Sequence, residues 1–320
     1  MKRCKLLALA ALLLLTGCAA PGTPGQASPE RHKIAMIVQT DATQFWKSIF
    51  AGAEAAAGEY NLELSISFPA QREDYEAQNR LVEQAVAEGA EAIVFSAIDY
   101  EQNAPAIDAA AEAGVQVVVI DSDVHSDKVD VRISTNNYLA GRQAAQAVLD
   151  SGLEELNVAM VGFGQGTANV LARQQGVRDV LTGKENVHIV STLNLLSDAD
   201  TVQDRIAVMI ERHPETNVVV ACNELTSVGA ANALEAMGLA DRVWMVGFDS
   251  NVHTLDLLQT GAVDALIVQN PYAMGYLGTE AGYALITGKP ADQTVETAVT
   301  TVTRENLFDP DIQKIAFAFQ

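Results

Sequence analysis

Cysteine is scarce in this chain, which has 3 among its 320 residues. Cys4 and Cys18 lie near the N-terminus, so the remainder of the chain contains only Cys222. A single cysteine cannot form an internal disulfide, and the stability of the body must therefore come from its core. Cys222 lies within the apolar run "VVVACNE", which indicates a small buried side chain rather than a nucleophile.

Positive charge is also in short supply, with 20 Lys+Arg against 41 Asp+Glu. Three of those cations, Lys2, Arg3 and Lys5, stand in the first five residues, so the rest of the chain has 17 cations against 41 acids. Nucleic-acid binding depends on clustered cations. The charge balance therefore predicts a protein with no nucleic-acid partner.

Only one long apolar run is present, from Leu6 to Leu15, and no run of eighteen or more follows it. The basic residues before it and the small residues after it predict a secretory signal over residues 1–17. The segment "LTGC" resembles the bacterial lipobox, which implies that Cys18 is lipidated and becomes the new N-terminus; an ordinary signal peptide is the alternative. Residues 18–32, rich in Pro, Gly, Ala and Ser, predict a flexible tether.

Signatures of catalysis are weak or missing. "VVVIDSDVH" superficially matches the Asp-x-Asp phosphatase motif, but it follows a fourth strand, and His125 stands where Thr or Val is needed. "GFGQGTAN", residues 162–169, lacks the Lys-Ser/Thr ending of a P-loop and predicts a turn capped by Thr167 before a helix. The five histidines show neither metal-ligand spacing nor a triad. We therefore predict no enzyme, no metal and no cofactor, with a hydrolase acting through Asp121 or Asp249 as the alternative.

From Lys33 onward, strand-like and helix-like segments alternate regularly. The strand-like runs are nearly continuous in apolar residues, as parallel strands covered on both faces are. They are "IAMIV", "LELSIS", "AIVFS", "VQVVVI", "NVAMVG", "VHIVS", "NVVVA", "VWMVGF" and "VDALIV". Helical patterns of about ten to eighteen residues separate them, several ending at Gly. This alternation predicts a doubly wound α/β architecture.

The chain also resembles itself. Residues 90–123 and 216–250 each contain an apolar strand, a polar turn, an Ala-rich helix, a Gly, a second apolar strand and an Asp. We therefore predict two similar parallel-sheet lobes; a single large sheet is the alternative. In open parallel sheets, ligands bind beyond the carboxyl ends of the strands. Asp121, Asn223 and Asp249 stand at such ends, which predicts that they face a cleft between the lobes.

Aromatic and amide side chains add to this predicted cleft. Phe45 and Trp46 open the first helix after the first strand. Adjacent helical side chains diverge by about 100°, so both rings cannot easily face the sheet, and one is expected to face the cleft, where it could stack on a sugar. Gln269 ends a later strand in "IVQNPY", whose Asn-Pro also predicts a crossover between lobes. An ionised Asp can accept two hydroxyls, which suits a polyhydroxylated ligand.

These residues resemble those of the ribose-type periplasmic binding proteins, the solute receptors of ABC sugar importers. The resemblance extends over residues 33–305. It is based on six ordered segments, which are "IAMIVQTDATQFW", "VVVIDSD", "TNNYLAG", "ACNE", "WMVGFDS" and "ALIVQNPYAMG".

The resemblance implies a type I periplasmic binding fold whose two lobes close on a ligand about a three-segment hinge. The N-terminal lobe would comprise residues 33–135 plus 270–299, and the C-terminal lobe 136–269 plus 300–320. The implied ligand-binding residues are Phe45, Trp46, Asp121, Asn169, Asn223, Asp249 and Gln269. The implied hinge residues are Thr135, Asn136, Asn270 and Thr300.

Three departures bear on the ligand. Ser122 and Leu171 stand where the ribose receptor has arginines, and the aromatic expected in the second lobe falls near Ser197. They predict a roomier and more acidic pocket for another sugar, a polyol or a small sugar-derived signal. We thus expect an exported, lipid-anchored, monomeric receptor that delivers its ligand to an ABC permease; a receptor for a membrane sensor is the alternative. Lactose-repressor-type regulators share the two-lobe body, but they need a DNA-reading helix-turn-helix where this chain has its signal.

Overall fold

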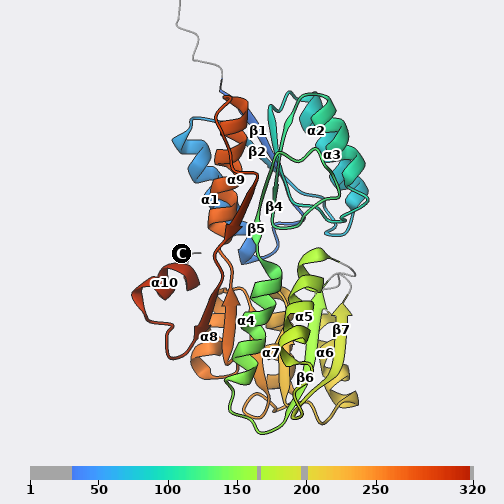
Figure 1. Cartoon of the computed structure of the whole chain (residues 1–320), viewed down its shortest axis with the longest axis vertical. Coiled ribbons are helices and arrows are strands. Elements are labelled where there is room, and N and C mark those ends of the chain that lie inside the picture. Colours follow the sequence, from blue (N-terminus) through green and yellow to red (C-terminus); the bar gives the residue numbers. More distant parts are fainter. Residues whose placement is uncertain (1–30, 164–166, 196–200, 318–320) are drawn as a thin grey trace, which may run out of the picture. The chain divides into compact units, whose positions relative to one another are not determined.

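The computed structural model describes residues 31–163, 167–195 and 201–317. These residues build two six-stranded sheets, each dominated by parallel pairs (Figure 1). The predicted α/β fold with two doubly wound sheets is therefore confirmed, and the single large sheet is wrong. We call each sheet, together with the helices that pack on it, a lobe.

The first sheet has the strand order β11-β5-β4-β3-β1-β2. Its strands are β1 (Lys33–Ile37), β2 (Glu63–Ser67), β3 (Ala92–Phe95), β4 (Gln116–Ile120), β5 (Val131–Thr135) and β11 (Thr294–Thr297). The helices of this lobe are α1 (Gln44–Glu59), α2 (Tyr75–Ala87), α3 (Ala104–Glu112) and α9 (Pro271–Ile286). Helices α1 and α9 share one apolar core with the sheet, and α2 and α3 share another, so both faces are covered.

The second sheet repeats this order as β12-β10-β9-β8-β6-β7. Its strands are β6 (Leu156–Phe163), β7 (Val187–Leu195), β8 (Val218–Ala221), β9 (Trp244–Phe248), β10 (Ala265–Val268) and β12 (Thr300–Thr303). The helices of this lobe are α4 (Asn137–Leu149), α5 (Ala168–Leu181), α6 (Val202–Arg212), α7 (Glu224–Ala236), α8 (Val252–Thr260) and α10 (Pro310–Ala316). Helices α4 and α5 cover one face, and α6, α7 and α8 cover the other.

Three strands, β5, β11 and β12, carry no continuous apolar run, and the sequence did not predict them. Strand β5 alternates buried and half-buried residues, and β11 and β12 are edge strands rich in Thr. Only β12 departs from the parallel pattern, because it pairs antiparallel with β10. Half-buried or exposed positions interrupt all three strands, so their sequences lack the apolar run that marks the central strands.

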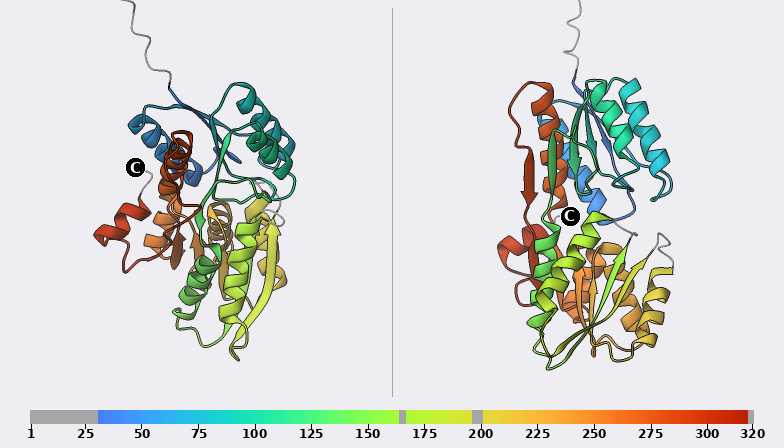
Figure 2. Two further views of the ribbon diagram at one scale, coloured as in Figure 1. Left: turned by 45° about the horizontal axis from the view of Figure 1, so that its top comes forward. Right: turned by 45° about the vertical axis from the view of Figure 1, so that its right-hand side comes forward.

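The chain crosses between the sheets three times, and each of the first two crossings begins a helix. Asn136 follows β5 and accepts the Leu139 N–H as the N-cap of α4; Asn270 follows β10 and accepts the Ala273 N–H as the N-cap of α9. The third crossing runs from β11 to β12. Consequently, α9 lies beside α1, far from it in sequence, and α4 lies beside α5 (Figure 2).

Glycines allow these helix pairs to approach closely. A Cβ added at Gly52 of α1 would overlap the carbonyl oxygen of Tyr272, and one at Gly275 of α9 would overlap that of Ile49. The second lobe repeats the device, with Gly141 of α4 against Arg173 and Gly176 of α5 against Tyr138. Both lobes thus depend on backbone-to-backbone contact between a helix and one that follows a crossing.

Candidate functional site

Asp121 and Asp249 stand at matching places in the two sheets, directly after β4 and β9. Their backbones are left-handed, with φ of 55° and 65°. Each backbone N–H donates 3.0 Å to a carbonyl in the neighbouring strand, Asp121 to Ile133 and Asp249 to Ile267. Non-glycine residues with positive φ are uncommon and often mark functional sites, and Asp tolerates this conformation better than most. The fold therefore turns each carboxylate away from its strand at the carboxyl edge of its sheet.

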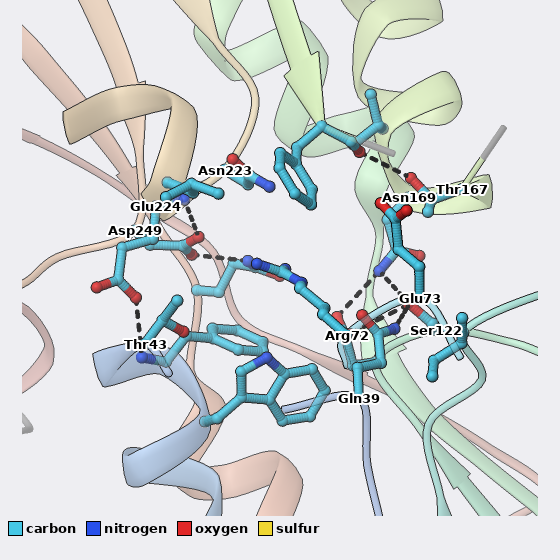
Figure 3. A pocket seen from close by; sticks show the side chains of 18 of the residues that line it. Gln39, Thr43, Arg72, Glu73, Ser122, Thr167, Asn169, Asn223, Glu224 and Asp249 are labelled. Carbon is cyan, nitrogen blue, oxygen red and sulfur yellow. Dashed lines mark hydrogen bonds between the residues drawn. The ribbon is translucent and has the colours of Figure 1, made fainter. Parts of the chain in front are cut away.

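Both carboxylates line one cavity of about 240 Å³, to which both lobes contribute (Figure 3). The other five residues predicted to bind ligand line it too; they are Phe45, Trp46, Asn169, Asn223 and Gln269. The predicted residues are therefore brought together. The volume lies below the roughly 300–1,000 Å³ of pockets for drug-sized ligands, which suits a single sugar ring rather than a chain of sugars.

The Asp121 carboxylate is bonded across the cavity. Its Oδ1 accepts Asn169 Nδ2 of the second lobe at 3.0 Å, and its Oδ2 accepts the Ser122 hydroxyl at 3.2 Å. Ser122 also receives Asn169 Nδ2 at 3.2 Å and Gln39 Nε2 at 3.0 Å. Serine in place of the expected arginine thus becomes the centre of a small amide and hydroxyl network.

The Asp249 carboxylate is bonded within its own lobe. Gln269 Nε2 donates to its Oδ1 at 2.7 Å, and the Glu224 backbone N–H donates to its Oδ2 at 3.0 Å. The Gln269 Oε1 in turn accepts the Thr135 hydroxyl at 2.8 Å, at the first crossing. A carboxylate has about four acceptor sites, so both aspartates keep capacity for hydroxyl groups.

Burial raises the pKa of both carboxylates. For Asp249 the pKa rises to about 6, and for Asp121 it rises as well, while the Arg173 guanidinium opposes the rise in each case. Arg173 is itself buried and fixed; it donates to Asn137 Oδ1 at 2.8 Å and to the Cys222 carbonyl at 2.6 Å. Arg173 therefore acts as a held countercharge behind the two acids.

The two aromatic rings both line the cavity, in a T-shaped pair with centroids 5.3 Å apart. Trp46 is also 2% exposed and belongs to the core of the first lobe, whereas Phe45 packs against that core from outside. The expectation that the rings divide between core and cleft is thus too simple, because Trp46 serves both.

Glu224 joins the lobes and was not predicted to lie in the site. Its carboxylate accepts the Gln44 N–H at 3.2 Å and the Phe45 N–H at 3.0 Å, both at the start of α1 in the other lobe. Asn251 Nδ2 donates to the same carboxylate at 2.8 Å. Helix α1 has no capping bond from Thr43 and no acidic residue in its first turn. Glu224 therefore caps a helix of the opposite lobe.

Two residues outside the predicted set supply an aromatic ring and a cation to the cavity. Phe163, at the end of β6, lines the cavity from the second lobe and supplies an aromatic ring there; Ser197, where the ring was expected, lies outside the described residues. Arg72, between β2 and α2, supplies a guanidinium, whereas Leu171 is 48% exposed and does not line the cavity. The expected loss of two cations and one ring is therefore seen only in part, because Arg72 supplies one cation and Phe163 supplies a ring.

Of the remaining predictions, one is confirmed, one is wrong and one lies outside the described residues. Cys222 is buried, and burial raises the pKa of its thiol to about 12, which confirms a packed side chain. Thr167 precedes α5 but donates to the Phe163 carbonyl instead of capping the helix, so its predicted capping bond is wrong. Cys18 lies outside the described residues. In the part of the chain that is described, no three metal-ligating side chains gather, and no helix is long and apolar enough to cross a bilayer.

The fold and the interlobe cavity define a class of two-lobed binding proteins, and comparison with known proteins agrees. The model of the periplasmic binding protein domain matches residues 34–290. This chain therefore belongs to the periplasmic binding proteins, and within them to the ribose-type sugar-binding family.

The similarity to known relatives and solved structures extends over most of the chain. The ribose import binding protein of Bacillus subtilis is 25% identical over 301 residues, covering 92% of this chain and 96% of that protein. The D-ribose/D-allose-binding protein of Pseudomonas aeruginosa is 27% identical over 318 residues, covering 95% and 99%. A carbohydrate transporter solute-binding protein of Agrobacterium radiobacter, solved with D-arabinose, superposes with a TM-score of 0.86 at 29% identity, covering 90% of this chain and 100% of that one.

Proposed function

We propose that this protein is the extracytoplasmic solute-binding component of an ABC importer and that it binds a monosaccharide or a similar polyol between its lobes. The observation that carries the proposal is the pair of buried carboxylates, Asp121 and Asp249, which face one cavity from equivalent edges of two sheets. Relatives named as ribose, allose and apiose binders support the ligand class.

In this proposal, Asp121, Asn169, Asn223, Asp249 and Gln269 hold hydroxyl groups, and Phe45 and Trp46 pack against the apolar face of the ring. Figure 3 shows Asn223 and Asp249 facing Asn169 and Ser122 across the cavity. A ligand that touches residues of both lobes favours the form in which the lobes contact each other, since contacts to both lobes exist only there.

The proposed hinge is the set of three crossings. They bond to one another, through Thr135 to Gln269 at 2.8 Å, Thr135 to Thr297 at 3.5 Å, and Asn136 to Glu296 at 3.1 Å. Rotation about Thr135, Asn136, Asn270 and Thr300 would move residues 33–135 and 270–299 against residues 136–269 and 300–320 with little change inside either lobe.

Lipidation at Cys18 would tether the body, through residues 19–32, to the outer face of a membrane beside its permease. A monomer suffices for this task, because both halves of the site come from one chain. A receptor that reports to a membrane sensor would use the same cavity, and it remains the second candidate.

Thermal unfolding with D-ribose, D-allose, D-arabinose, D-apiose and D-fucose, followed by calorimetric titration, tests the proposal. A bound sugar raises the melting temperature through mass action. Asp249→Asn keeps the left-handed backbone but removes the charged acceptor, and we expect affinity to fall about ten- to a hundredfold, from about 1.5–3 kcal/mol per charged hydrogen bond. Exposed Asp241→Asn is the matched control and leaves affinity unchanged. Equal affinity in Asp249→Asn would reject the assignment.

A further inference from the structure

Arg72 enters the cavity from an unexpected element. It lies in the loop between β2 and α2 of the first lobe, and its side chain extends between Asp249 on one side and Asn169 on the other (Figure 3). Its Cζ atom lies 4.6 Å from the centroid of the Phe163 ring, which belongs to the second lobe. Arg72 is thus placed to touch both a bound ligand and the opposite lobe.

The guanidinium of Arg72 has hydrogen-bond donors to offer. Among the described residues, none accepts a hydrogen bond from it, although it lies close enough to Asp121 for that charge to act on it. Arg72 is half-buried, and burial lowers its pKa while Asp121 opposes this shift. A guanidinium has five N–H donors, and buried donors are normally satisfied.

Arg173 provides the contrast. Its Nε and Nη1 atoms donate to Asn137 and to the Cys222 carbonyl, and its guanidinium stacks 4.6 Å from the centroid of Phe248. Arg173 is committed to its own lobe. Of the two arginines that line the cavity, Arg72 is therefore the one whose planar fork of donors is directed at the space between the lobes.

We infer that Arg72 is the residue that selects the ligand, by donating two N–H groups to a pair of adjacent oxygens on a hydroxyl-rich molecule while the aspartates accept its hydroxyl protons. This role rests on the proposed function. Stacking on Phe163 requires the lobes to be in contact, so the same side chain couples the oxygen pattern of the ligand to closure. Arg72 thereby supplies, from the β2–α2 loop, the guanidinium that Ser122 and Leu171 cannot supply.

The charges around the cavity decide against an acidic ligand. Five carboxylates line it, those of Glu73, Asp99, Asp121, Glu224 and Asp249, against the two guanidinium groups of Arg72 and Arg173. An added carboxylate would be repelled by this excess of negative charge. Arg72 therefore acts as a directional donor to neutral oxygens rather than as an anion site.

Calorimetric titration of Arg72→Met and Arg72→Lys, using the sugar of the above panel that binds most tightly, tests this role. We expect Arg72→Met to weaken binding about ten- to a hundredfold, and Arg72→Lys to recover only part of the loss because it keeps the charge without the planar fork. Arg80→Met removes an exposed arginine of α2 and serves as the control, with affinity unchanged. Phe163→Leu should weaken binding about threefold to tenfold by removing the stacking surface.

The wild-type protein is also titrated with D-arabinose and with its acid, D-arabinonate, and the acid is expected to bind at least tenfold more weakly. Unchanged sugar affinity in Arg72→Met, or tighter binding of the acid, overturns the role of Arg72 while leaving sugar binding intact. If none of the panel binds the wild type, the proposed function and this inference both fail.

Discussion

Asp121 and Asp249 occupy equivalent places in two sheets of the same strand order, yet their carboxylates are held differently. Asp249 is bonded by Gln269 and by the Glu224 backbone, both in its own lobe. Asp121 is bonded by Asn169, which belongs to the other lobe. The partners of Asp249 are therefore independent of contact between the lobes, whereas Asp121, which also accepts the Ser122 hydroxyl of its own lobe, gains Asn169 only when the lobes meet.

This difference gives the two halves different tasks. The second lobe holds Asp249 by its own Gln269 and Glu224 at 2.7 and 3.0 Å, so it suits the role of the half on which a ligand first settles. The first lobe contributes Asp121, Arg72 and the start of α1, all of which contact second-lobe residues. It suits the role of the half that closes over the ligand.

The largest effect is expected where the lobes are alike, in the helix pairs α1–α9 and α4–α5. Gly52→Ala and Gly176→Ala would each force a Cβ into a facing backbone carbonyl, and each should lower the free energy of unfolding by about 3 kcal/mol or more. Urea denaturation measures the loss.

Gly58→Ala, on the same helix as Gly52, is the matched control for that experiment. A Cβ at Gly58 meets nothing within 4 Å, so this change should stabilise the protein by about 0.5–1 kcal/mol. If Gly52→Ala behaves like Gly58→Ala, then the close helix contact is wrong.

The second-largest effect is a loss of roughly 2–3 kcal/mol in the free energy of unfolding as the pH rises, and it should distinguish Asp249 from Asp121. Burial raises the pKa of Asp249 to about 6, above the ~3.9 of an unfolded aspartate, so the folded protein binds more protons between pH 4 and 6. This contribution to stability is complete below about pH 4 and is lost as the pH rises through 6. Urea titrations of the protein without sugar from pH 4 to 7.5 should show the decline, and Asp249→Asn should remove the part of it that is due to Asp249.

Asp121→Asn is the comparison for that series, because burial raises the pKa of Asp121 as well. Its own part of the slope should disappear while the part due to Asp249 persists. A slope that is the same in wild type and Asp249→Asn contradicts the assignment of the titrating group.

The smallest effect concerns the contact between Glu224 and the start of α1. Glu224→Gln keeps the shape but turns one amide N–H toward the Gln44 or Phe45 N–H, and we expect sugar binding to weaken by about 1–2 kcal/mol. Glu235→Gln, exposed near the end of the same helix, should change nothing.

Because Glu224 also lines the cavity, affinity alone does not isolate its role at α1. Spin labels on cysteines placed at the exposed residues Glu83 of α2 and Glu211 of α6 report the distance between lobes, and buried Cys222 stays unlabelled. Glu224→Gln should shift the distance distribution of the sugar-free protein toward longer values. An unchanged distribution would assign Glu224 to ligand contact alone.

Much of the fold could be predicted from the sequence because its central strands are covered on both faces. Strands β1, β3, β4, β6, β8, β9 and β10 each coincide with an apolar run, and the edge position of Asp121 and Asp249 follows from where those runs end. Edge strands β11 and β12 carry no such run, so only three-dimensional pairing reveals them.

Site residues were predictable where they directly follow a strand with a continuous apolar run, and those in other places were missed. Arg72 lies five residues beyond β2, a strand of which no residue is fully buried, so nothing in its surroundings marks the loop. Glu224 was visible in "ACNE", but its role requires the start of α1, 179 or 180 positions away in sequence. Contacts between lobes are not encoded in any local pattern.

Helix α9 follows β10 of the second sheet in the chain but packs in the first lobe. This arrangement sets an order in which the lobes can form as the chain emerges from the ribosome. The apolar face formed by Ile34, Met36 and Val94 is completed by Met274 and Ala281 of α9, which are synthesised only after β6 to β10 of the second lobe. Residues 136–268, by contrast, hold α4 and every strand of the second sheet except β12. The apolar face of the half that is made first is therefore covered only by α1 until α9 is made, while the half that is made second can assemble most of its sheet before then.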